Sequence, residues 1–230
     1  MENKIISVIP VKDKSERVES KNFRLFDQNL SLFEFKLLQI INSKAFDEIY
    51  ISSDSEKAEE IAKNYSLKFI KRPQEFCNNT TPWSEVIHHV VDSLNICDND
   101  HVAWCHTTSP LFDSYSKAVT VYFDKLSKGY NGLISVSAFK EFLVNEKSRP
   151  FNYNWGVWHD YSQNLETLYR ITGSLFISTK KEMIKNRYVI STKPYLFESS
   201  AFEGIDIDTE FDFKLAQLLY QNKSQFIINE

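Results

Sequence analysis

The chain has 230 residues, of which 42% are hydrophobic and 25% are charged, and its formal net charge is −4 at neutral pH. This length suffices for one globular domain with a full core, so we expect residues 1–230 to form a single domain. The acidic balance disfavours nucleic acid as a partner. The lack of a long apolar run or of a signal-like N-terminus disfavours a membrane and predicts a cytoplasmic location.

Apolar runs of strand length alternate with helix-like segments up to residue 136. Strands are predicted at 5–9, 48–51, 67–70, 101–105 and 132–136, and helices at 32–41, 83–94 and 116–126. Ser53 and Glu56 have the spacing of a capping box, which predicts a further helix after the second strand. The alternation predicts βα units and therefore an α/β fold around a largely parallel sheet.

The alternation stops between residues 137 and 168, where Phe, Tyr, Trp and Asn are frequent and hairpins or loops are predicted. Regular structure resumes with strands at 174–178 and 195–198 and helices at 180–185 and 210–219. We therefore expect one irregular excursion from an otherwise regular fold.

A basic segment follows the first strand. Lys12, Lys14, Arg17 and Lys21 supply four cations within ten residues, and Asn22 comes next. Nucleotidyl transfer needs cations beside the phosphates as pyrophosphate leaves, and a loop after a buried strand is a common phosphate site. The alternative is a solvated basic turn, because lysine-rich turns are common.

An acidic segment precedes the last predicted helix. Asp206 and Asp208 lie two residues apart, which places both carboxylates on one side of an extended chain. There they can hold Mg²⁺ together with substrate phosphates. Asp212 is better placed to orient the segment or to cap the helix, and acidic N-capping alone also explains Asp208 and Glu210.

Three other polar residues are candidate ligand contacts. Arg72 follows the third strand, and His106 and Ser109 follow the central strand. The carboxyl ends of parallel strands form the usual ligand edge of such a sheet. The alternatives are a surface charge for Arg72, a turn-forming role for Ser109 and a structural role for His106.

Together these motifs resemble the acylneuraminate (CMP-sialic acid) cytidylyltransferase family, of which the chain looks like a divergent member. The family pattern IPARxGSKGIxxKN is matched at Ile9, Pro10, Ser15, Lys21 and Asn22. Further matches follow in the family's order along nearly the whole chain, at Arg72, Thr108, Ser109, Pro110, Leu111, Gln163, Leu165, Tyr169, Gly173, Ile207, Asp208 and Asp212.

The chain also departs from the family patterns at particular positions. In the basic loop Lys12 stands where the family prefers Arg, Lys14 and Arg17 replace glycines, and Glu16 replaces a lysine. Elsewhere His106 replaces Gln, Thr172 replaces Asn, and Phe112 and Ser162 replace arginines. Because an acceptor carboxylate ordinarily pairs with an arginine, Ser162 indicates an unusual acceptor.

The resemblance implies a Rossmann-like nucleotidyltransferase fold, CTP and a small-molecule acceptor as ligands, and Mg²⁺ as cofactor. It also implies a homodimer formed through a small protruding dimerisation element at about residues 137–170. The implied roles are catalysis for Lys12, Lys21 and Asp208, ligand binding for Arg17, Asn22, Arg72, His106, Ser109 and Gln163, and metal binding for Asp206 and Asp208.

We therefore expect the protein to activate a nonulosonic acid or a related sugar acid as its CMP derivative, with release of pyrophosphate. A phosphorylated acceptor and a CDP-linked product form one alternative, which the extra cations Lys14 and Arg17 would suit. The others are a nucleotide-binding relative without catalysis, and a glycosyltransferase, since Asp206-Ile207-Asp208 is nominally a DxD tripeptide.

Overall fold

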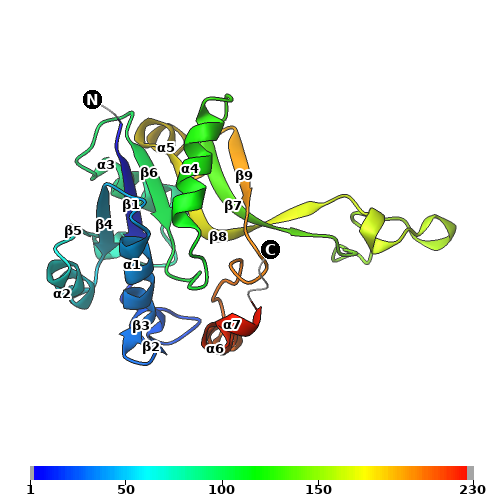
Figure 1. The fold of residues 1–230 in the computed structure, drawn as a ribbon, viewed down its shortest axis with the longest axis horizontal. Helices are drawn as coiled ribbons and strands as arrows, with labels where there is room; N and C mark the ends of the chain where they lie inside the picture. Colours follow the sequence, from blue (N-terminus) through cyan, green and yellow to red (C-terminus); the bar gives the residue numbers. More distant parts are fainter. Residues whose placement is uncertain (1–2, 227–230) are drawn as a thin grey trace.

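A central sheet of seven strands organises residues 3–226, the part of the chain that this computed structural model describes (Figure 1). In chain order its strands are β1 (Ile5–Pro10), β4 (Glu48–Ser53), β5 (Lys68–Lys71), β6 (His101–Cys105), β7 (Gly132–Phe139), β8 (Leu168–Thr179) and β9 (Pro194–Glu198). Their spatial order is β5-β4-β1-β6-β8-β7-β9, and β8 runs antiparallel to both of its neighbours. The remaining pairs are parallel, so the predicted α/β class with a mostly parallel sheet is confirmed.

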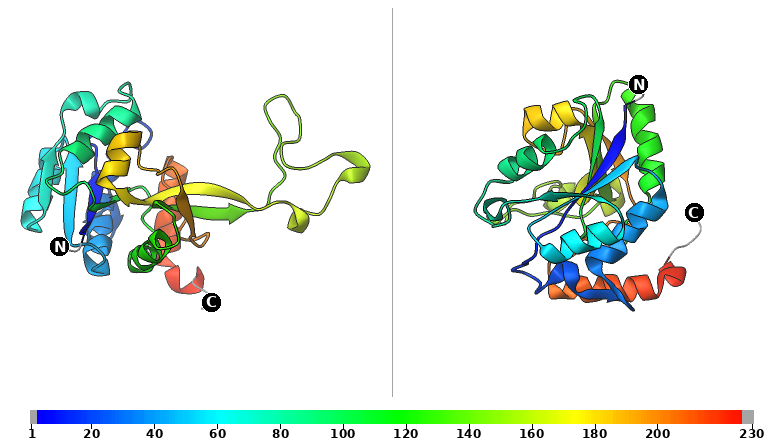
Figure 2. Two further views of the ribbon diagram at one scale, coloured as in Figure 1. Left: turned by 90° about the horizontal axis from the view of Figure 1, so that it is seen from above. Right: turned by 90° about the vertical axis from the view of Figure 1, so that its left-hand side faces the viewer.

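Helices cover both faces of the sheet (Figure 2). One face packs against α1 (Leu32–Ser43), α2 (Glu56–Asn64) and α4 (Tyr115–Leu126), and the other against α3 (Trp83–Asp92) and α5 (Lys180–Asn186). Strand β1 shows why both layers form, because Ile5 and Ile9 join the first cluster while Ile6 and Val8 join the second.

A third apolar cluster lies beside the sheet and joins α1 to the C-terminal helix α6 (Glu210–Gln221). Between them lies the short ribbon of β2 (Leu25–Asp27) and β3 (Leu30–Ser31), whose Phe26 ring meets the Phe213 ring edge-on at 5.9 Å between centroids. The short helix α7 (Lys223–Phe226) follows α6. The ribbon and α7 were not predicted, because segments this short carry little periodicity.

Two local predictions need correction. The N-cap of α2 is Ser55, and Ser53 Oγ accepts a hydrogen bond from the Ser55 backbone N–H at 3.0 Å. The predicted Ser53–Glu56 capping box is therefore wrong, since Ser53 ends β4 and its hydroxyl is used within the turn. Strand β8 also begins six residues before the predicted start at 174, because it pairs with β7 as far as Phe139.

Residues 140–167 form an arm that extends far from the sheet at the end of the β7–β8 ribbon (Figures 1 and 2). Two short 3₁₀ turns, η3 (Gly156–Trp158) and η4 (Ser162–Asn164), interrupt it. Several of its large apolar side chains are exposed, among them Phe151, Val157 and Trp158. The arm occupies the predicted irregular segment, and its role in dimerisation stays a prediction.

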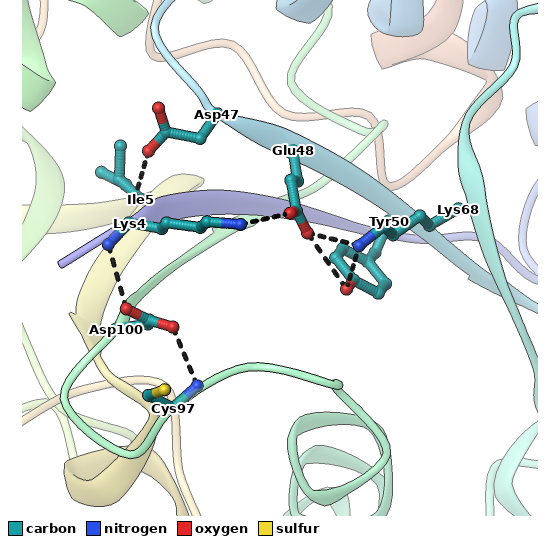
Figure 3. A network of polar contacts seen from close by, with 8 residues as sticks. All are labelled: Lys4, Ile5, Asp47, Glu48, Tyr50, Lys68, Cys97 and Asp100. Atoms are coloured by element: carbon teal, nitrogen blue, oxygen red, sulfur yellow. Dashed lines mark hydrogen bonds and ion pairs between the residues drawn. The ribbon is translucent and has the colours of Figure 1, made fainter. Parts of the chain in front are cut away.

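The edge of the sheet where the parallel strands begin is fixed by carboxylates (Figure 3). Asp47 Oδ2 accepts from the Ile5 backbone N–H at 2.8 Å, and Asp100 Oδ1 accepts from the Lys4 N–H at 3.0 Å. Glu48 accepts from the ammonium groups of Lys4 and Lys68 at 2.8 and 2.6 Å. These contacts hold the starts of β1, β4, β5 and β6 together, at the edge opposite the carboxyl ends of the same strands.

Candidate functional site

A pocket of about 580 Å³ opens at the carboxyl ends of β1 and β6. Its walls come from the loop after β1, the segment before α3, the segment after β6 and the loop before α6. Because β4 lies on one side of β1 and β6 on the other, the connections leave in opposite directions at this point. Such a switch point is where ligands bind in open α/β sheets.

The four predicted cations, Lys12, Lys14, Arg17 and Lys21, all line this pocket. Lys12 Nζ donates to the Asn78 carbonyl and to Asn79 Oδ1, each at 3.0 Å. Burial, followed by the charge of Arg72, lowers the pKa of Lys12. Both hydrogen-bond partners of Lys12 are neutral, so neither of them replaces a phosphate as a partner for its charge.

Lys21 and Asn22 are buried in the 3₁₀ turn η1 (Lys21–Phe23) and hold the walls of the pocket together. Lys21 Nζ donates to the Ile207 carbonyl at 2.7 Å, and burial lowers its pKa while Asp206 partly opposes that shift. Asn22 donates through Nδ2 to the Lys12 carbonyl at 2.9 Å and accepts from Thr107 Oγ1 at 2.7 Å. Lys21 thus joins the basic loop to the acidic loop, and Asn22 joins it to the end of β6.

Asp206 and Asp208 face the same pocket, as their spacing predicts. Ile207 between them is fully buried, and its N–H donates to the Thr108 carbonyl at 2.8 Å. Asp208 Oδ1 pairs with Arg17 Nη2 at 2.8 Å. Asp206 Oδ1 is buried without a hydrogen-bond partner among the described residues, and burial raises the pKa of this carboxyl.

Asp212 caps α6 and does not line the pocket. Its Oδ2 accepts from the backbone N–H groups of Asp208 and Thr209 at 3.1 and 2.8 Å, and Thr209 Oγ1 accepts from the Asp212 N–H at 3.3 Å. This capping box fixes the turn that carries Asp208, which is the orienting role expected for Asp212.

His106 lines the pocket as a neutral imidazole at the end of β6. Trp104 Nε1 donates to His106 Nε2 at 2.9 Å, so the ring proton lies on Nδ1. Burial lowers the pKa of His106 to about 4, although the backbone of Gly173 opposes that shift. Gly173 has a φ of 75°, within the stretch where β8 shifts its register against β7. The glycine lets the backbone approach the ring there.

Three predicted ligand contacts are not in the pocket lining: Arg72, Ser109 and Gln163. Arg72 is 2% exposed, and its guanidinium donates to the Val11 carbonyl at 2.7 Å and to Cys77 Sγ at 3.0 Å. It therefore supports the basic loop from behind. Ser109 is buried and Gln163 lies in the arm. Their ligand contacts stay predictions.

Sequence reasoning did not single out Trp83 as part of the site. Trp83 is the first residue of α3, lines the pocket and meets the Trp104 ring edge-on, at 5.8 Å between centroids. The available signal was its place after Pro82, at a helix start that follows the carboxyl end of a strand.

Within residues 3–226, no three His, Cys, Asp or Glu side chains gather into a metal site. The pair Asp206 and Asp208 nevertheless suits Mg²⁺, which usually takes one or two carboxylates and completes its shell with water and phosphate oxygens. The buried, unpartnered Oδ1 of Asp206 is a ligand atom that a cation can use.

A mostly parallel sheet whose switch point combines clustered cations with paired carboxylates defines a nucleotidyltransferase-type α/β protein. The family model described as cytidylyltransferase matches residues 6–230, and the chain therefore belongs to the cytidylyltransferase family. The predictions of the family and of a cytidylyltransferase enzyme are confirmed by this match and by the relatives below.

Several curated relatives are named as cytidylyltransferases or CMP-sugar synthases of particular acids. CMP-N,N'-diacetyllegionaminic acid synthase of Legionella pneumophila is 28% identical over 240 residues, which cover 98% of this chain and 100% of the relative. Pseudaminic acid cytidylyltransferase of Campylobacter jejuni is 25% identical, with 95% and 97% covered. N-acylneuraminate cytidylyltransferase of Escherichia coli is also 25% identical over 98% of this chain, which spans only 54% of that protein.

Solved structures of nucleotidyltransferases share the fold. A 4-diphosphocytidyl-2C-methyl-D-erythritol synthase superposes with a TM-score of 0.68 at 13% identity, covering 95% of this chain and 100% of its own. CMP:2-keto-3-deoxy-manno-octonic acid synthetase complexed with CTP superposes with a TM-score of 0.64 at 11% identity, covering 96% and 100%. These likenesses confirm the predicted Rossmann-like nucleotidyltransferase fold.

None of the helices within residues 3–226 is long and apolar enough to cross a membrane.

Proposed function

We propose that the protein transfers the cytidylyl group of CTP to a hydroxyl of a nonulosonic acid or related sugar acid. The products are a CMP-linked sugar and pyrophosphate. The observation that carries this proposal is that four cations and the carboxylates of Glu16, Asp206 and Asp208 line one pocket at the carboxyl ends of β1 and β6. The named activities of the relatives support the acceptor class, and the CTP complex of a protein with the same fold supports the nucleotide.

In the proposed reaction the acceptor oxygen attacks the α-phosphorus of CTP, and the bond to the bridging oxygen breaks as pyrophosphate leaves. Lys12 and Lys21 offset the negative charge that builds up on the phosphates, and Arg17 assists from the same loop. Lys21 is held in place by its bond to the Ile207 carbonyl, so its charge needs little reorganisation.

Asp206 and Asp208 are the residues that would hold Mg²⁺. When bound, the ion supplies positive charge that polarises the phosphoryl group and screens the leaving pyrophosphate. A nearby cation favours the ionised carboxylate and so opposes the burial that raises the pKa of Asp206.

We also infer that the arm forms a homodimer, because the exposed side chains of Phe151, Val157 and Trp158 retain 69%, 88% and 76% of their accessible area. Apolar surface of this kind on a projecting element is typical of a subunit interface. The cytoplasmic location predicted from the sequence stays a prediction.

The test is pyrophosphate release by the purified protein with Mg²⁺, one nucleoside triphosphate and a panel of nonulosonic acids. We expect release with CTP and little with ATP, GTP or UTP, and mass spectrometry should find a CMP-linked product. The absence of turnover with every nucleotide and acceptor would contradict the proposal. A CDP-linked product with a phosphorylated acceptor would support the alternative reaction instead.

A further inference from the structure

Arg17 makes an ion pair that the proposed reaction does not require. Its Nη2 lies 2.8 Å from Asp208 Oδ1, and the two side chains come from different loops that line the pocket. Both are accessible, at 67% and 50% of their side-chain areas. The guanidinium therefore occupies an oxygen of one of the two carboxylates that suit a metal ion.

The second carboxylate, Asp206, differs from Asp208 in its hydrogen-bond partners. Asp206 Oδ1 is buried and lacks a hydrogen-bond partner among the described residues. Lys21 is close enough to favour the ionised form of Asp206, yet its ammonium donates to the Ile207 carbonyl. One carboxylate thus has a free oxygen, while the other is engaged by Arg17.

The loop that carries Arg17 is anchored at Asp13 and at Val18. Asp13 is anchored near the end of β4, where Ser55 Oγ donates to its Oδ1 at 2.8 Å. Val18 is 1% exposed and packs in the third apolar cluster. Between these anchors, a change of rotamer moves the guanidinium without moving the loop.

A guanidinium and a divalent cation compete for the same carboxylate, because both need its oxygens and their charges repel. A triphosphate is the better partner for the guanidinium, since it offers several charged oxygens in a geometry that arginine matches. Nucleotide binding would therefore shift Arg17 from Asp208 to phosphate and release the Asp208 carboxylate for the metal.

We propose that Arg17 couples the two ligands of this site: without nucleotide it occupies Asp208 and weakens metal binding, and the triphosphate draws it away and opens the carboxylate pair. This inference rests on the proposed function, because it takes Mg²⁺ and CTP as ligands. The coupling is reciprocal, so the metal must also strengthen nucleotide binding by the same factor.

The first test measures Mn²⁺ binding without nucleotide, through loss of the free-ion electron paramagnetic resonance signal. Arg17→Met should bind Mn²⁺ about two- to fivefold more tightly than the natural protein, which is the range of an exposed ion pair. Lys14→Met is the matched control, because Lys14 lies in the same loop with the same charge and no ion pair to Asp208. Lys14→Met should tighten Mn²⁺ binding less than Arg17→Met does. The Mn²⁺ affinity of Arg17→Lys should lie between those of Arg17→Met and the natural protein.

The second test measures CTP binding by isothermal titration in EDTA. Here Arg17→Met should weaken binding, because the guanidinium no longer reaches the phosphates. Opposite effects on metal and nucleotide support the proposal, since general damage to the pocket would weaken both. Equal tightening of Mn²⁺ binding in the Arg17 and Lys14 variants would overturn it. The proposal is also overturned if the natural protein binds Mn²⁺ measurably and Arg17→Met binds it no more tightly.

The third measurement applies if neither protein binds Mn²⁺ alone. The factor by which Mg²⁺ strengthens CTP binding should then be larger in the natural protein than in Arg17→Met, and equal factors would overturn the proposal. If neither the natural protein nor any variant binds Mn²⁺ even with saturating CTP, Asp206 and Asp208 do not bind the metal and the proposed coupling is wrong. Pyrophosphate release, measured separately, reports whether the proposed function survives.

Discussion

Asp206 is the side chain on which the proposed chemistry depends most directly, because it lines the pocket and its buried Oδ1 has no hydrogen-bond partner among the described residues. Asp206→Asn keeps the shape and removes the charge. We expect kcat/KM to fall by about 10²–10³, the usual effect of removing one preorganised electrostatic group. The measurement is pyrophosphate release at saturating Mg²⁺, with the thermal unfolding midpoint of the variant as a check on folding.

Asp212→Asn is the matched control for that change. It replaces an acidic residue of the same segment, and Asp212 caps α6 without lining the pocket. We expect a free energy of unfolding lower by about 0.3–1 kcal/mol, because the change removes a negative charge from the first turn of α6, with activity within a few fold of the natural protein. Equal losses of activity in both variants would contradict the role assigned to Asp206. They would indicate that the acidic segment only caps α6.

The spacing of residues in the sequence was enough to place some side chains of the site but not others. Two carboxylates separated by one residue share a side whenever the chain is extended, so the pairing of Asp206 and Asp208 was predictable. The direction in which the Arg72 side chain points was not predictable, because an arginine at the end of a strand can contact either a ligand or the loop behind the pocket. Its guanidinium is committed to the Val11 carbonyl, a contact 61 residues away in sequence.

Among the elements, the arm is separable from the rest of the fold. None of the three apolar clusters includes a residue between 140 and 167, whereas β7 and β8 remain paired up to its base. Replacing residues 141–166 with an Asn-Gly turn should therefore leave the sheet and its helices folded. We expect the variant to be monomeric by light scattering after gel filtration, and the natural protein to have twice the mass of its own single chain.

A milder change tests the same idea without a deletion. Trp158→Ser combined with Val157→Ser removes two of the most exposed apolar side chains of the arm and leaves its length unchanged. The pair should raise the dimer dissociation constant while the thermal unfolding midpoint extrapolated to low concentration stays constant. A natural protein that is monomeric at all concentrations would refute the dimer.

The regular elements were predictable because each buries a periodic apolar face. Strand β6 spans 101–105 as predicted, and its five residues are all buried. Failures arose where tertiary contacts decide the outcome. The start of β8 at Leu168 depends on pairing with β7, and the N-cap of α2 depends on how Ser53 ends β4. Neither contact leaves a local pattern in the sequence.

At the scale of the whole molecule, the edge of the sheet away from the pocket ties several strands together through Glu48 (Figure 3). Hydrogen bonds from Lys4 and Lys68 lower the pKa of Glu48 to about 2. The ion pairs therefore add stability above the ordinary carboxyl pKa of 4.5, and that contribution is lost as the pH falls toward 2. Glu48→Gln should lower the urea midpoint at pH 6 and make little difference near pH 2.

A suitable control is Glu59→Gln, which removes an exposed pair with Lys63 within one helix. Its effect at pH 6 should be smaller, because one flexible surface pair holds no separate strands together. A Glu48→Gln difference that stays constant from pH 2 to pH 6 would contradict the role of its charge.

A lysine with no exposed area gives the fold a second dependence on pH. Lys36 on α1 donates through Nζ to the Phe112 carbonyl at 2.7 Å and to Gln39 Oε1 at 3.0 Å, so it joins α1 to the segment after β6. The Tyr115 ring lies 5.0 Å from the ammonium. Burial lowers the pKa of Lys36 to about 7, because no carboxylate pairs with it closely enough to offset the lost hydration.

The sign of the resulting pH dependence follows from proton counting. Below pH 7 both states hold the Lys36 proton, whereas between pH 7 and 10.5 the unfolded chain holds a proton that the folded protein has released. Stability therefore rises with pH in that window, with a slope of up to about 1.4 kcal/mol per pH unit. Lys36→Met should remove this slope in urea unfolding between pH 7 and 8.5, below the range where Cys105 titrates, and Lys117→Met on the exposed side of α4 should retain it. An unchanged slope in Lys36→Met would show that Lys36 keeps its proton in the fold.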